Sequence, residues 1–78
     1  MVKAYILLKV KPGVERNIVE ELKDVVEIES VEELYGEWDI ILKGSVNIDE
    51  LDVLLSEKIR KIEGVALTST MIVANYKY

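Results

Sequence analysis

A short turn followed by an apolar run is the feature that most restricts the fold of this 78-residue chain. Gly36 is expected to form the turn, because glycine enters positive φ without a steric penalty. The run Ile40-Ile41-Leu42 is too short and too rich in β-branched residues to favour a helix. The stretch therefore predicts a hairpin that leads into a central strand at residues 38–43, with Asp39 at their junction.

The residues before the hairpin predict a strand, a helix and a second strand. Alternation over residues 2–11 indicates a strand with one wholly apolar face. Pro12 and Gly13 end this strand, and a helix follows to about residue 24. The apolar stripe of that helix consists of Val14, Ile18, Leu22 and Val25. Glutamates within residues 28–35 suit an edge strand, because charge discourages pairing with foreign strands.

A second helix is predicted after the central strand. The Gly-Ser pair at residues 44–45 is expected to end that strand. Asn47, followed by Glu50, is a near match to a capping box, and the helix should extend to about residue 61. Its apolar stripe consists of Ile48, Leu51, Leu55, Ile59 and Ile62. Gly64 is expected to close the helix as a C-terminal glycine cap.

The order of elements predicts the topology. A last strand at residues 65–74 completes the series strand, helix, strand, strand, helix, strand. Residues 6–9 and 40–43 occupy matching places in the two halves, which resemble repeats of a split βαβ unit. Right-handed crossovers place both helices on one face of an antiparallel sheet. The predicted fold is therefore α+β and ferredoxin-like, as one domain over residues 1–78.

The sheet face away from the helices is expected to mediate dimerisation. It would carry Tyr5, Leu7, Ile41 and one side of the last strand, either Thr68, Thr70 and Ile72 or Ser69, Met71 and Val73. Burying one aliphatic side chain is worth roughly 1.5 to 3 kcal/mol, which a small domain needs. We therefore expect a homodimer through this face, with an interface made by Tyr5, Leu7, Ile41 and Ile72.

Composition excludes several classes of function. A net charge of −5 without a basic block would repel a nucleic-acid backbone. The chain has no cysteine for a disulfide or a thiolate metal site, and its glutamates lack converging partners, so neither a metal nor a cofactor is expected.

With neither a secretion signal nor a bilayer-spanning run, the protein is expected to be cytoplasmic. Abundant Glu, Lys, Val and Ile without His, Gln or Cys fits a thermophile.

Two motifs resemble those of a known family. Residues 34–40, Leu-Tyr-Gly-Glu-Trp-Asp-Ile, are similar to the Gly-x-(aromatic)-Asp-(aliphatic) hairpin of the Lrp/AsnC ligand-binding domain, also called the RAM domain. Residues 62–73 resemble the closing Gly-Val-x-x-Thr-x-Thr-x-x-Val segment of that domain. The opening at residues 4–10 is similar as well, so the resemblance covers nearly the whole chain.

The resemblance implies an effector domain that dimerises through its sheet and stacks dimers into octameric or decameric rings. An amino acid would bind between dimers, near the hairpin and the threonine strand. Full-length members carry an N-terminal helix-turn-helix, whereas this chain starts at the first strand of the effector domain. We therefore expect a stand-alone form without direct DNA binding. Its role in transcriptional or metabolic regulation would then depend on assembly with a full-length relative or another partner.

The resemblance also suggests which residues hold the amino acid. Asp39 could bind the ammonium, while backbone groups around Gly36 and the hydroxyls of Thr68 and Thr70 could hold the carboxylate. Tyr35 would contact the ligand or pack in an interface. The alternative interpretation is structural: Asp39 pairs with a lysine, Gly36 only makes a turn, and the threonines are good strand formers.

Two other classes of function remain open from the sequence. Dimeric ferredoxin-like barrels include small monooxygenases and isomerases, but without His or Cys the catalytic group would have to be Asp39, Tyr5, Tyr35 or a lysine. An ACT-type regulatory domain shares the element order and carries its glycine at the end of the first strand, where Pro12-Gly13 stands here. The favoured hypothesis is an amino-acid-binding module that is not an enzyme.

Overall fold

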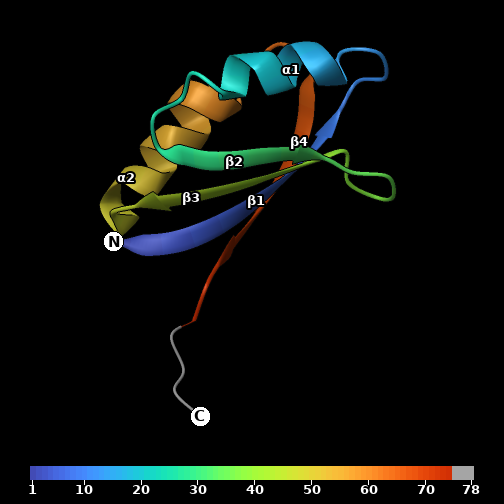
Figure 1. Ribbon diagram of the computed structural model, residues 1–78. Helices are drawn as coiled ribbons and strands as arrows, with labels where there is room; N and C mark the ends of the chain where they lie inside the picture. The colour runs from blue at the N-terminus through green and yellow to red at the C-terminus, as the bar shows by residue number, and fades with distance from the viewer. Residues whose placement is uncertain (75–78) are drawn as a thin grey trace.

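The computed structural model, described over residues 1–74, has a layer of helices packed on one face of a sheet (Figure 1). The elements are β1 (Val2–Val10), α1 (Glu15–Leu22), β2 (Ile28–Glu33), β3 (Ile40–Val46), α2 (Ile48–Val53), the π-helical segment η1 (Leu54–Ile59) and β4 (Val65–Ile72). All strand pairs are antiparallel, in the order β2-β3-β1-β4. The predicted ferredoxin-like α+β fold is confirmed. No helix of the described residues is long and apolar enough to cross a membrane.

The core lies between the helices and the covered face of the sheet. Alternate residues of β1 and β3 point into it, because successive side chains of a strand point to opposite faces. The buried residues of these two strands are Ala4, Ile6, Leu8, Val10, Ile40, Leu42 and Val46. From α1, Ile18 and Leu22 pack against them, with Val14 and Val25 partly buried beside them as the predicted stripe requires.

The third strand extends further at its C-terminal end than predicted. Gly44, expected to end the strand, instead pairs with Ala4 inside β3, and the strand continues to Val46. A Cβ on Gly44 would lie 2.5 Å from the backbone oxygen of Glu27, in the connection between α1 and β2. The glycine therefore marks the close approach of another backbone segment and not the end of a strand.

The second helix changes its winding halfway along. The N–H of Arg60 donates to the carbonyl of Leu55 at 2.8 Å, a bond that spans five residues as in a π-helix. The hydroxyl of Ser56 donates to the carbonyl of Asp52 at 2.7 Å, a side-chain bond that competes with the helical pattern. Wider turns suit the four-residue spacing of Leu51, Leu55 and Ile59, all of which are buried.

The start of this helix differs from the prediction in two ways. Asn47 precedes the first helical residue, but its side chain donates to the carboxylate of Glu50 at 3.2 Å and caps no backbone N–H. Ile48, expected in the apolar stripe, is exposed. At about 100° per residue, Ile48 and Leu54 lie on opposite sides of Leu51, and only Leu54 faces the sheet.

Strand register decides which side of β4 faces away from the helices. Directly opposed residues of an antiparallel pair point to the same face. Tyr5 opposes Met71 and Leu7 opposes both Ser69 and Ile41, so these residues share the uncovered side. We call this side the open face. Its central residues are Tyr5, Leu7, Ile41, Leu67, Ser69 and Met71, and Lys3, Lys9 and Lys43 lie on the same side.

The same register corrects the prediction for Ile72. Ile72 opposes Ala4, a buried residue, and therefore lies on the helix-covered side of the sheet. It was expected to belong to the open face together with Tyr5, Leu7 and Ile41, and this placement is wrong. Of the two alternatives for the last strand, the structure selects the one that contains Ser69 and Met71.

The two edges of the sheet differ in charge. β2 ends one edge and carries glutamates at three of its six positions, Glu29, Glu32 and Glu33. β4 ends the other edge with the sequence Val-Ala-Leu-Thr-Ser-Thr-Met-Ile, which contains no charged residue. The charge that discourages foreign pairing is thus present on one edge and absent from the other.

Candidate functional site

The hairpin between β2 and β3 is tied to the end of β1 by Asp39. The Asp39 N–H donates to the carbonyl of Leu8 at 2.9 Å, and its carbonyl accepts from the N–H of Leu34 at 2.8 Å. The carboxylate Oδ2 accepts from the N–H of Val10 at 2.8 Å. Because the paired register of β1 and β3 ends at Leu8 and Ile40, the carboxylate supplies an acceptor where the backbone ladder stops. Asp39 thus has a structural partner, but a backbone N–H and not a lysine.

The turn itself projects away from the sheet. Gly36 has φ of 142°, a value that side-chain-bearing residues rarely adopt, which accounts for glycine at this position. Tyr35 beside it is fully exposed. The ammonium of Lys9 donates to the carbonyl of Glu37, so β1 holds the turn at a second point.

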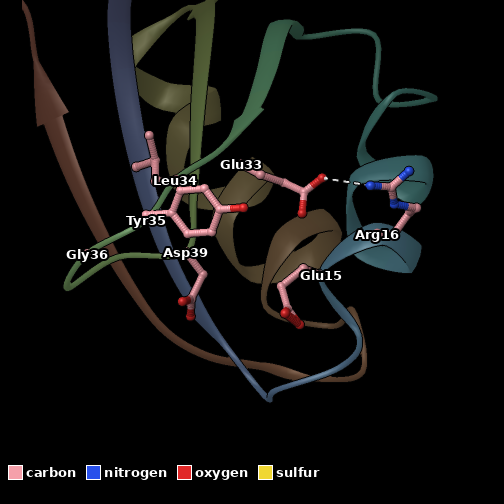
Figure 2. A pocket seen from close by; sticks show the side chains of 7 residues that line it. All are labelled: Glu15, Arg16, Glu33, Leu34, Tyr35, Gly36 and Asp39. Carbon is pink, nitrogen blue, oxygen red and sulfur yellow. Dashed lines mark ion pairs between the residues drawn. The ribbon is translucent and has the colours of Figure 1, made fainter.

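A hollow of about 400 Å³ lies between this turn and the start of α1 (Figure 2). We call it the hairpin hollow. Its lining comprises Glu15, Arg16, Glu33, Leu34, Tyr35, Gly36 and Asp39. Three of the predicted ligand-binding residues, Tyr35, Gly36 and Asp39, therefore meet in one place. The prediction from sequence missed Glu15 and Arg16 from α1, and it also missed Glu33 and Leu34 at the end of β2. The short connection after β1 was a signal that the helix begins beside the hairpin, whereas the glutamates of β2 were expected only to suit an edge strand.

The hairpin hollow has an excess of negative charge. It is lined by three carboxylates, those of Glu15, Glu33 and Asp39, against one guanidinium, that of Arg16. A carboxylate oxygen of Glu15 accepts from the backbone N–H of Gly13 at 2.6 Å. Arg16 and Glu33 approach to 3.9 Å with side chains 84% and 46% exposed, so their attraction is weak. The hollow is therefore suited to a ligand that carries positive charge.

The two threonines lie elsewhere within one chain. Thr68 opposes Leu8, and Leu8 opposes Ile40 on its other side, so β1 separates β4 from β3. Two strand spacings amount to about 10 Å. Thr68 lines a second hollow and accepts a hydrogen bond from Nε of Arg60 at 3.3 Å, while Thr70 opposes buried Ile6. The structure does not bring Thr68 or Thr70 to Asp39, so a ligand touching both sets would need two subunits.

A four-stranded antiparallel sheet with two helices on one face, the second of them ending in a π-helical segment, defines a small domain of the ferredoxin-like α+β class. The family can be stated as well. The family model described as the Lrp/AsnC ligand binding domain matches residues 3–77, and the chain belongs to this family. The resemblance seen in the sequence is thereby confirmed.

Individual relatives agree with this assignment. The HTH-type transcriptional regulator FL11 of Pyrococcus furiosus is 39% identical over 71 residues, which are 90% of this chain and 46% of that protein. The crystal structure of FFRP-DM1 has 39% identity and a TM-score of 0.90, covering 95% of this chain and 100% of that one. A transcriptional regulator from Neisseria meningitidis, solved as an L-Met complex, shares the fold alone, with 17% identity, a TM-score of 0.85, and 95% and 50% coverage.

The matched family is one of regulatory proteins. Lrp/AsnC regulators are oligomeric and bind amino-acid effectors, and the family is not one of enzymes. Relatives from Pyrococcus fit the thermophilic composition. The chain spans about half the length of the curated relatives that it matches.

Proposed function

We propose that this chain is an effector-binding module that dimerises through the open face and binds a free amino acid in the hairpin hollow. The observation that carries this proposal is the position of Asp39 at the border of that hollow. Its backbone and one carboxylate oxygen are fixed by three hydrogen bonds, so the side chain is held in place before any ligand arrives. Preorganisation of this kind lowers the cost of binding.

In this proposal the ammonium of the amino acid binds the Asp39 carboxylate. Among the described residues, the hydrogen bond to Val10 occupies Oδ2 of Asp39, and Oδ1 is left to accept from a ligand. Charge-assisted hydrogen bonds to an ammonium are the stronger kind. The carboxylate of the ligand would meet the guanidinium of Arg16 or the backbone of Gly36, where no side chain blocks approach. The L-Met complex of the Neisseria regulator supports an amino acid as the class of effector.

Binding would regulate through assembly. A ligand held between subunits stabilises the assembled form by mass action, and assembly in turn strengthens ligand binding by the same factor. Thr68 and Thr70, which lie two strand spacings from Asp39 within one chain, would contribute from a neighbouring subunit. In this scheme the chain acts in transcription or metabolism through a full-length Lrp/AsnC relative or another partner.

The test is a screen of the twenty amino acids by thermal shift and by sizing, on the wild type, Asp39→Asn and Asp39→Ala. We expect at least one amino acid to raise the melting temperature of the wild type by several degrees at saturating concentration. Asp39→Asn keeps an acceptor for the Val10 N–H but lacks the charge, so it should melt near the wild type without responding to the ligand. Asp39→Ala should lose both stability and response.

Two outcomes would count against the proposal. The first is a wild type that none of the twenty amino acids shifts or binds in calorimetric titration. The second is a full ligand response in Asp39→Asn, which would show that the Asp39 carboxylate is only structural.

A further inference from the structure

The charges of the hairpin hollow exceed what an amino acid with a neutral side chain can balance. In the proposed function, Asp39 takes the ammonium and Arg16 takes the carboxylate. The carboxylate of Glu33 then remains at the hollow without a partner from the ligand. We propose that the hollow selects an amino acid with a cationic side chain, whose charge Glu33 receives. This inference rests on the proposed function.

The contact between Arg16 and Glu33 is one that a ligand can open at little cost. Their closest atoms, joined by the dashed line in Figure 2, are 3.9 Å apart, which is long for an ion pair. The Arg16 side chain is mostly in solvent and that of Glu33 is about half exposed. Exposed pairs of this kind contribute little to stability. A ligand with both charges could therefore separate them, placing its carboxylate against Arg16 and its side-chain cation against Glu33. Arg16 and Glu33 would then each lie closer to a charged group of the ligand than they now lie to one another.

The other acid of the hollow already has its own partner. Glu15 accepts from the N–H of Gly13 at 2.6 Å and 3.4 Å through its two oxygens. It therefore adds to the negative potential of the hollow without competing for the role of Glu33. Among the described residues no group of acids could hold a metal ion, so an organic cation remains the matching chemistry.

The remaining lining suits the stem of a long basic side chain. Leu34 supplies an apolar surface and Tyr35 an aromatic ring beside Glu33 (Figure 2). A cation close to a tyrosine face is attracted by the ring as well as by a carboxylate. An acidic amino acid would instead bring a second negative charge into a site that is already negative, and it should bind worst.

The test compares two ligands that differ by one amino group. L-Lysine and L-norleucine share the α-amino acid head and a straight four-carbon stem, and only lysine carries the terminal ammonium. By calorimetric titration at low salt, we expect lysine to bind the wild type at least about fivefold more tightly than norleucine. Equal binding of the two, or tighter binding of norleucine, would overturn the inference and leave the proposed function intact.

A matched pair of variants assigns the preference to one residue. Glu33→Gln should bring the affinity for lysine down to that for norleucine and leave norleucine unchanged. Glu29→Gln makes the same change of charge on the same strand outside the hollow, and should preserve the preference. A preference that survives in Glu33→Gln would overturn the assignment. Failure of both ligands to bind the wild type, together with the other amino acids of the screen, would instead remove the proposed function itself.

Discussion

At the scale of single residues, Gly44 shows how one missing side chain sets the distance between two segments. The backbone oxygen of Glu27 occupies the space that a Cβ on Gly44 would need, 2.5 Å away. We expect Gly44→Ala to lower the free energy of unfolding by about 1 to 3 kcal/mol, because backbone atoms must shift to relieve the clash. Urea unfolding at fixed protein concentration measures the change. Ser45→Ala, at the next position of β3, should stay within about 0.5 kcal/mol, and equal losses in the two variants would contradict this interpretation.

Single residues also show where prediction of the site from sequence stops. Tyr35, Gly36 and Asp39 are neighbours in the chain, so a turn was enough to place them together. The α1 residues of the hairpin hollow could not be found in this way, because their place depends on how the helix packs against the hairpin. The hydrogen bond from the Val10 N–H to the Asp39 carboxylate could not be predicted either, because it joins residues that are 29 positions apart in the sequence.

At the scale of elements, an ion pair joins the π-helical segment to the connection between α1 and β2. Nζ of Lys58 lies 2.8 Å and 3.0 Å from the two carboxylate oxygens of Glu27. The hydrogen bond from Lys58, helped by a backbone hydrogen bond, holds the pKa of Glu27 below its usual range. A lowered carboxyl pKa stabilises the fold above the ordinary glutamate pKa, about 4.3, and this contribution is lost as the pH falls through the folded value.

Lys58→Met tests this link between the two elements. At pH 7 the variant should unfold more easily by about 0.2 to 1 kcal/mol, since the pair is partly exposed. The difference from the wild type should shrink as the pH is lowered from about 5 to about 3, because Glu27 then becomes protonated in both proteins. Melting temperatures across this range give the comparison. Lys61→Met removes the same charge from a pair on the protein surface and should show a smaller effect at pH 7. A difference that does not change with pH would rule out Glu27 as the partner that matters.

The elements themselves were largely predictable, and the errors have physical causes. Alternation was enough to predict β1 and its buried face, because one side of that strand is wholly apolar whereas the other carries lysines at its ends. In β4 both faces carry apolar residues, so the pattern could not tell whether Ile72 or Met71 points away from the helices. Strand pairing with β1 decides that question, and pairing is not encoded in the strand alone. The exposed position of Ile48 likewise depends on which side of the helix meets the sheet.

At the scale of the whole molecule, neighbouring residues of β4 provide a test of dimerisation. Met71 lies on the open face and Ile72 on the helix-covered side, with similar exposed fractions of 50% and 45%. We expect Met71→Lys to shift the protein toward monomers at micromolar concentration, because it places a charge in the proposed interface. Ile72→Lys adds the same charge on the other side and should leave the dimer intact. Sedimentation velocity distinguishes these states, and an equal effect of both variants would exclude the open face as the interface.

The charge-free edge formed by β4 affects how prone the protein is to aggregate during its synthesis in a cell. A newly synthesised subunit that has not yet assembled exposes this uncharged edge, whose unpaired backbone donors and acceptors can pair with another extended chain. Assembly that pairs this edge with another copy would then serve as protection against misfolded deposits. Variants that cannot assemble should accordingly be recovered less in the supernatant and more in the insoluble pellet, even where each copy folds correctly.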